Sequence, residues 1–272
     1  MRLNSHAGHG RQDSKSCGAV DIIKESVEDR LVNDTFVRLG REYGNTVFDC
    51  TVDYPNSKQD CLNKIVAKCN ANLVDLDVSH HFNSGRNDDL GDGSIGGVEV
   101  YVYSANNPTY EIGERVCANI EKLGFKNRGV KVKPEYFYLR KTKNKAMIIE
   151  YLFVDDKDDC NLYRKVGHEA LAKAALEGIL NKRLDKKVYK NCILYGNEVD
   201  KVGAEIIKWS KDDCIVKNVN DHIAWEATNL FTVGGQAKSE LDKMKTGEKY
   251  TSIVGKDRLD TMQQCLDFAK SR

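Results

Sequence analysis

Four residues in the first 150 positions carry the side chains that metal-assisted hydrolysis requires: His9, Glu25, His81 and Glu150. A catalytic zinc ion takes three nitrogen or oxygen ligands and keeps one position open for water, and a nearby carboxylate accepts the proton of that water. Two histidines and one carboxylate form such a shell, whereas a structural zinc site more often uses thiolates. The four residues therefore indicate a candidate zinc hydrolase site, with Zn²⁺ as its cofactor.

The local sequence around each of these residues decides how much weight it carries. Glu25 opens a predicted helix, where the helix dipole alone would favour a carboxylate. His80 and His81 are adjacent, so on a strand their side chains point to opposite faces. We choose His81, because Asn83 shares its face and can orient a substrate or a ligand. Glu150 lies within the apolar run 146–153, where an acid is costly to bury unless it is paired or needed.

Residues 1 to about 180 alternate between predicted strands and helices, which indicates an α/β domain with a twisted, mostly parallel sheet flanked by helices. The loop 83–97 is rich in Gly, Asn, Asp and Ser, and we expect it to be exposed at the border of a substrate groove. The expected strands lie near Leu3 and at 45–49, 73–78, 98–103 and 146–153, and the expected helices at 25–41, 62–69 and 165–181.

A second, smaller domain follows a polar segment. The pattern predicts a catalytic domain over 1–181, a linker over 182–188 and a small C-terminal α/β domain over 189–272. In the last of these, a strand running into glycine recurs at 193–196, 231–235 and 253–255, a weak internal repeat.

Composition excludes several classes of protein. The net charge is +1, and the 42 basic and 41 acidic residues are interspersed, so we expect no nucleic-acid partner. No stretch approaches the ~20 apolar residues that cross a bilayer, and the first residues have no apolar signal region, so we expect no membrane insertion. The nine cysteines include no C-x-x-C pair, and we expect reduced thiols.

Several short stretches, in order along residues 1 to 180, resemble the type-3 N-acetylmuramoyl-L-alanine amidases, especially the clostridial phage endolysins built on that domain. The resemblance implies that His9, Glu25 and His81 bind zinc and that Glu150 is the catalytic carboxylate. The matching stretches are Ala7-Gly8-His9-Gly10, Lys24-Glu25-Ser26, Ser79-His80-His81-Phe82-Asn83, Gly97-Val98-Glu99-Val100-Tyr101, Asn127-Arg128-Gly129-Val130-Lys131 and Ile148-Ile149-Glu150.

The implied reaction is hydrolysis of the amide between the lactyl group of N-acetylmuramic acid and L-alanine in bacterial peptidoglycan. Asn83 and Arg128 are candidates for positioning glycan or peptide, although a turn amide and a surface cation explain them equally well. His6 stands where the family usually has an acidic residue, so a contact around the metal is altered or His6 competes for the ion. Lys145 replaces a common proline, which changes loop stiffness only.

Beyond residue 188 the chain resembles, less closely, the cell-wall-binding domain of the same endolysins, through 229–235 and 255–261. This resemblance implies binding to a cell-wall polymer. It also implies a homo-oligomer, or association with the protein's own C-terminal fragment produced from a second start near Val188. Finding no ~10 kDa C-terminal band when the native gene is expressed would remove the second start.

Three other functions remain open from the residues alone. A zinc endopeptidase cutting the stem peptide would use the same metal ligands. A glycosidase using Glu25 and Glu150 would release reducing sugars and ignore chelators. A non-catalytic wall-binding protein would not clear a wall suspension. The missing signal region favours a phage enzyme that waits in the host cytoplasm until lysis and then acts on the cell wall.

Overall fold

The computed structural model describes residues 1–184 and 188–271, and the chain divides into two compact units, Met1–Leu184 and Asp185–Arg272. Part of the predicted linker, residues 185–187, lies outside the described residues. Leu184 packs in the hydrophobic core of the first unit, so this unit continues beyond the predicted boundary at 181. None of the helices in the described ranges has the length and apolar character needed to span a membrane.

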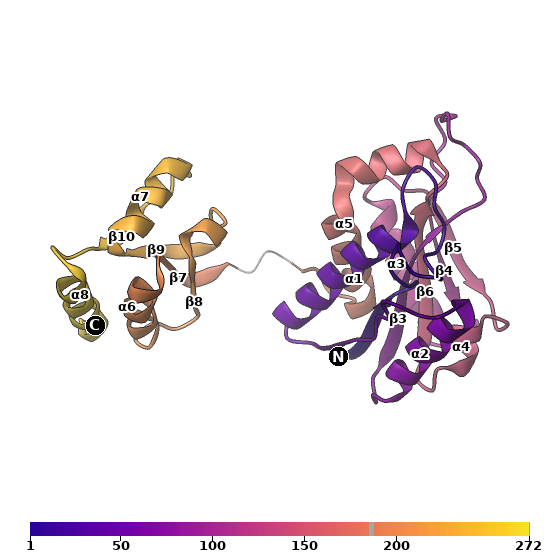
Figure 1. The fold of residues 1–272 in the computed structure, drawn as a ribbon, viewed down its shortest axis with the longest axis horizontal. Helices are drawn as coiled ribbons and strands as arrows, with labels where there is room; N and C mark the ends of the chain where they lie inside the picture. Colours follow the sequence, from indigo (N-terminus) through magenta and orange to yellow (C-terminus); the bar gives the residue numbers. More distant parts are fainter. Residues whose placement is uncertain (185–187, 272) are drawn as a thin grey trace. The chain divides into compact units, whose positions relative to one another are not determined.

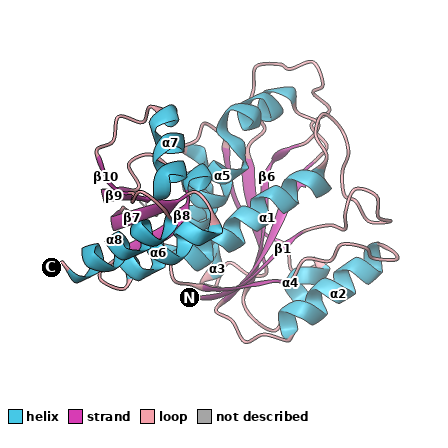
Figure 2. Ribbon diagram, turned by 60° about the vertical axis from the view of Figure 1, so that its left-hand side comes forward, coloured by secondary structure: helices cyan, strands magenta, loops and turns pink. Residues whose placement is uncertain are grey.

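The first unit is a six-stranded sheet with helices on both faces (Figures 1 and 2). Its elements are β1 (Arg2–Ala7), α1 (Glu25–Glu42), β2 (Thr46–Asp49), α2 (Lys58–Asn70), β3 (Leu76–Asn83), β4 (Val98–Val102), α3 (Thr109–Glu121), β5 (Asn127–Val132), α4 (Phe137–Lys141), β6 (Ala146–Phe153) and α5 (Lys157–Leu180). The strand order is β2-β1-β3-β6-β4-β5, and every neighbouring pair is parallel except β4 and β6. The predicted α/β class with a mostly parallel sheet is confirmed.

The two faces of this sheet have different environments because side chains alternate along each strand. On β3, Leu76 and Val78 point into the main hydrophobic core, which α1, α3 and α5 cover. On β6, Ile148 points the other way, into a smaller core under α2 and α4 that includes Ile65 and Tyr138. Odd-numbered residues of β3 and the even-numbered residues of β6 up to Glu150 therefore share the α2/α4 face, and a register shift follows between His81 and Asn83.

The second unit is a four-stranded, all-parallel sheet in the order β10-β9-β7-β8. Helices α6 and α8 contact each other, and α7 packs with the short 3₁₀ turn η1. Its elements are β7 (Tyr189–Tyr195), α6 (Glu198–Lys208), β8 (Cys214–Asn218), η1 (Val219–Asp221), β9 (Ala227–Val233), α7 (Gly234–Met244), β10 (Tyr250–Ile253) and α8 (Arg258–Lys270).

Several predicted boundaries were wrong. The strand expected from Leu73 begins at Leu76 and continues to Asn83, and the side chain of Leu73 is 83% exposed. The helix expected from 165 begins at Lys157 and includes a kink at Gly167, whose φ is 80°. The pattern also missed α3, α4, β5 and β8. All nine cysteines lie in the described ranges and are free thiols.

Candidate metal centre

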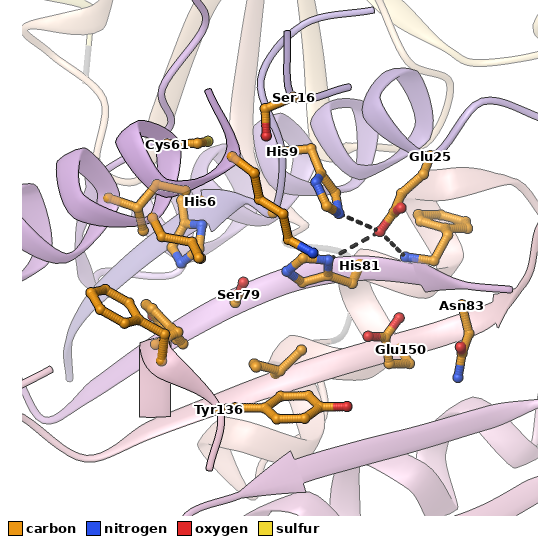
Figure 3. Close-up of a pocket in the computed structure, with 18 of the residues that line it drawn as sticks. His6, His9, Ser16, Glu25, Cys61, Ser79, His81, Asn83, Tyr136 and Glu150 are labelled. Carbon is orange, nitrogen blue, oxygen red and sulfur yellow. Dashed lines mark hydrogen bonds and ion pairs between the residues drawn. The ribbon is translucent and has the colours of Figure 1, made fainter. Parts of the chain in front are cut away.

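His9, Glu25 and His81 converge on one point near the carboxyl ends of β1 and β3 (Figure 3). Glu25 Oε1 lies 3.0 Å from His9 Nε2 and 3.0 Å from His81 Nδ1. The two imidazole rings stand edge to face, with centroids 4.8 Å apart. One donor atom from each residue lies within 4.8 Å of the others. The three residues come from the turn after β1, the first residue of α1 and β3.

The local sequence holds these three side chains in place. A Cβ atom at Gly8 would lie 2.1 Å from the His81 ring, so only glycine lets the chain pass beneath that imidazole. Gly18 has a φ of 74°, and a Cβ there would lie 2.6 Å from Glu25 Oε2. The backbone amide of Ala19 donates to Glu25 Oε2 at 2.8 Å, and that of His9 donates to Asp29 Oδ2 at 3.2 Å.

This donor set fits a zinc ion. Ligands about 2.0–2.1 Å from a tetrahedral zinc lie roughly 3.3 Å from one another, close to the 3.0 Å separations around Glu25. Two imidazoles and one carboxylate are also the ligand types of a catalytic zinc that keeps one position open. The ligand roles of His9, Glu25 and His81 stay a prediction that their placement supports.

The protonation states suit a cation. Burial raises the pKa of Glu25, but hydrogen bonds with His81 and His9 outweigh that effect and lower it, so the carboxylate is ionised. Burial lowers the pKa of His81, which favours the neutral imidazole that a metal binds. Burial also disfavours the charged form of His9, but Glu25 raises its pKa overall. A bound cation would replace the proton of His9.

Glu150 lies beside this cluster on the neighbouring strand. It pairs with His81 in the register of β3 and β6, and its side chain is on the α2/α4 face (Figure 3). Its Oε2 is buried and has no hydrogen-bond partner in the described part of the chain. Burial, and then the nearby charges of Glu25 and Glu99, raise the pKa of Glu150 well above the ordinary value. A carboxylate that tends to take up a proton is suited to act as a general base.

The two adjacent histidines have separate roles in the structure. His80 points into the main core, where it contacts Ser5 Oγ at 3.0 Å and Tyr151 Oη at 2.8 Å. It is fully buried with both ring nitrogens hydrogen-bonded. His81 points to the opposite face and contacts Glu25. The alternation expected for a strand is therefore what separates a structural histidine from a candidate ligand.

Asn83 and Arg128, predicted as substrate-binding residues, meet at a third carboxylate, Glu99. Asn83 Nδ2 donates to Glu99 Oε1 at 2.8 Å, and Arg128 Nε donates to Glu99 Oε2 at 2.7 Å. Lys131 Nζ and Tyr101 Oη also donate to Glu99. Contact of Asn83 or Arg128 with substrate stays a prediction. The sequence reading missed Glu99, although an acid in an apolar strand was the signal that identified Glu150.

A cavity of about 530 Å³ opens onto the cluster. Glu150, Asn83 and all three candidate ligands line it. His6 lines it too, and Figure 3 shows Ser79 between His6 and His81. Among the residues described, His6 does not belong to the group of donor atoms that lie within 4.8 Å of one another.

A histidine–carboxylate cluster on an open cavity, with a further carboxylate beside it, has the groups that a metal-dependent hydrolase requires. A family model described as N-acetylmuramoyl-L-alanine amidase matches residues 6–181. That match covers well over half of the chain, so the chain belongs to this family of zinc-dependent hydrolases.

Solved structures and curated sequences similar to this chain are also known. The catalytic domain of the CD27L endolysin, which targets Clostridium difficile, is similar with 26% identity and a TM-score of 0.61, over 68% of this chain and 99% of that one. The CwlD amidase of Clostridioides difficile, solved with the GerS lipoprotein, shares the fold at 16% identity and a TM-score of 0.56, over 66% of this chain and 96% of that one.

Uncharacterized protein CPE1502 of Clostridium perfringens is 29% identical over 189 residues, which make up 69% of this chain and 54% of the relative. The chain thus spans about half the length of this relative and of a second one from the same organism.

Proposed function

We propose that this protein is a peptidoglycan hydrolase that cleaves the amide between the lactyl group of N-acetylmuramic acid and L-alanine. The observation that carries the proposal is the convergence of His9, Glu25 and His81 beside the unpartnered Oε2 of Glu150, in a chain of the amidase family. A zinc ion held by the three residues would acidify water and polarise the scissile carbonyl.

The residues of the chain perform the proton transfers. Glu150 Oε2 takes a proton from the attacking water as the oxygen adds to the lactyl carbonyl carbon. The same carboxyl then gives the proton to the alanine nitrogen as the C–N bond breaks, releasing a free amine. Its raised pKa helps it to hold that proton between the two steps.

The test is digestion of purified peptidoglycan followed by mass analysis of the products. Wild type should produce peptides with a new N-terminal alanine and intact glycan, and a chelator should stop the reaction. Glu150→Gln should reduce the rate about 10²- to 10⁴-fold, whereas Glu111→Gln, at an exposed position on α3, should not change it. Cleavage within the stem peptide, release of reducing sugars, or activity that survives both treatments would refute the proposal.

We further propose that the protein is an endolysin of a bacteriophage, held in the host cytoplasm until lysis and then bound to the cell wall by its second unit. The similarity to the CD27L catalytic domain supports the lysis role. Co-sedimentation of the full chain with walls from several clostridia tests wall binding, and no binding to any of them contradicts it.

We also propose that the protein associates with itself or with its own C-terminal fragment. Light scattering tests this association, and a monodisperse single chain contradicts it.

A further inference from the structure

We propose that His6 and Ser79 form a subsite for the stem peptide immediately after the scissile bond. His6 Nε2 accepts a hydrogen bond from the amide N–H that follows the alanine, and the apolar wall beside it receives the alanine methyl group. The inference rests on the proposed amidase function, because it places the substrate relative to the candidate metal centre.

The hydrogen bonding of His6 identifies Nε2 as a free acceptor. His6 Nδ1 lies 2.9 Å from the backbone oxygen of Ala7. A carbonyl oxygen only accepts, so Nδ1 carries the proton and Nε2 has the lone pair. His6 is 1% exposed, and Nε2 has no hydrogen-bond partner within residues 1–184 and 188–271. A buried acceptor without a partner is destabilising, so a ligand that donates to it binds favourably.

His6 also stays uncharged. Burial lowers its pKa to about 3, so the imidazole is neutral wherever the protein is folded and active. The Tyr138 ring packs edge-on against it, with centroids 4.8 Å apart, which fixes its orientation. A neutral, oriented acceptor suits an amide N–H and does not suit a carboxylate.

The register of the sheet gives the distance from the metal centre. His6 pairs directly with Ser79 on the next strand, and His81 lies two residues further along that strand. Neighbouring strands about 4.8 Å apart and a rise of about 6.6 Å over two residues place the Cα atoms of His6 and His81, whose side chains share one face, roughly 8 Å apart diagonally. A peptide extended along this face advances about 3.5 Å per residue, so with the scissile bond at the candidate metal centre the amide that follows the alanine lies towards His6.

The walls of this part of the cavity favour peptide over glycan. Leu62 and Ile65 of α2, Phe137 of α4 and Ile148 of β6 line the cavity together with His6 and Ser79. Ser79 pairs with Ile148 as well as with His6, so the polar residues His6 and Ser79 adjoin the apolar side chains of the cavity. A methyl group and one amide match such a surface, whereas a sugar ring would leave most of its hydroxyl groups without partners.

The experiment compares two soluble substrates with the full-length protein. One is N-acetylmuramoyl-L-alanyl-D-isoglutamine, and the other replaces the second amide N–H with an ester oxygen. Wild type should cleave the amide about tenfold faster in kcat/KM, the value of one typical hydrogen bond. His6→Leu should cleave the two equally, and His6→Gln, which places an amide oxygen near the same point, should restore part of the preference.

The ratio of the two rates is independent of the fraction of folded enzyme, so loss of stability does not mimic the effect. His80→Leu is the matched control, because this histidine is equally buried on the opposite face, and it should keep the preference. No preference in wild type, or a full preference in His6→Leu, overturns the subsite. If wild type cleaves neither substrate nor peptidoglycan at the lactyl amide, the proposed function itself fails.

Discussion

Each of the two units contains a histidine close to carboxylates, and the two clusters differ in what their donor atoms already bind. In the first unit the donors of His9, Glu25 and His81 lie within 4.8 Å of one another and face a cavity. In the second unit the donors of Cys192, His222 and Glu226 meet the same distance criterion. Distance between donors therefore does not separate a candidate metal centre from a structural network.

The second cluster is already neutralised by protein groups. His222 Nε2 lies 2.7 Å from Glu248 Oε2, and its Nδ1 lies 3.3 Å from Glu226 Oε1. Lys217 Nζ lies 2.9 Å from Glu226 Oε2, where it supplies the positive charge that an ion would bring. The His222 side chain is only 1% exposed. An ion would have to displace that ammonium group to bind Glu226.

Among residues 1–184 and 188–271, no lysine or arginine forms an ion pair with Glu25, although Lys58 lines the same cavity. The nearby basic residues Arg128 and Lys131 form ion pairs with Glu99. The histidines at Glu25 are 21% and 17% exposed, so a ligand or water reaches them. The comparison teaches that a metal centre needs uncompensated negative charge and access from solvent as well as convergent donors.

The largest expected effect is on metal content. His81→Ala should reduce bound zinc from one ion per chain to background and lower amidase activity by about 10³-fold or more, because the metal supplies several kcal/mol of stabilisation to the reaction. His222→Ala should leave one zinc per chain. Elemental analysis after dialysis measures both. Loss of zinc from His222→Ala, or its retention in His81→Ala, would reverse the roles of the two clusters.

The next effect is on the stability of the second unit. His222→Ala leaves Glu226 and Glu248 buried with less compensation and should lower the free energy of unfolding by about 3–5 kcal/mol. Both tryptophans of the chain, Trp209 and Trp225, lie in this unit, so tryptophan fluorescence in a urea titration reports it selectively. Lys238→Ala, at an exposed ion pair on α7, is the control and should change it little. An unchanged midpoint for His222→Ala would show that the network is not stabilising.

The smallest effect concerns Glu99, whose charge is compensated as in the second cluster. Burial raises its pKa, but hydrogen bonds from Arg128, Lys131 and Tyr101 lower it to about 2, against an ordinary value of 4.5. Its contribution to stability is therefore complete above pH 4.5 and is lost as the pH falls towards 2. Since Arg128 and Lys131 are partly exposed, we expect about 1–2 kcal/mol after allowing for solvent screening.

Pulse proteolysis in urea between pH 5 and pH 3, with fragments of the first unit assigned by mass, measures this loss. Glu99→Gln removes the titrating group and should flatten the acid dependence relative to wild type, whereas Glu111→Gln should not. Parallel pH curves for Glu99→Gln and wild type would contradict the assignment.

The sequence predicted an element correctly where the local pattern of apolar residues was enough to identify it. The strand 146–153 is confirmed with both of its ends, because an apolar run of eight residues suits a buried central strand. The helix from Glu25 was predicted with an error of one residue at its end. The elements α4 and β5 were missed because α4 has only five residues and no residue of β5 is fully buried, whereas α3 was missed although Ile112, Val116 and Ile120 recur at helical spacing.

The sequence by itself determined the kinds of side chain available to the site and their order along the chain: two histidines and one acid close to strand or helix ends, and a second acid inside an apolar strand. It also determined that His80 and His81 face opposite ways, since alternation is a local property of a strand. Only the tertiary structure decided which acids are free to react. Glu99 and Glu150 are both acids in apolar strands, and they differ because Arg128 and Lys131 reach Glu99 from β5. Charge compensation depends on distances across the sheet, which no local pattern contains.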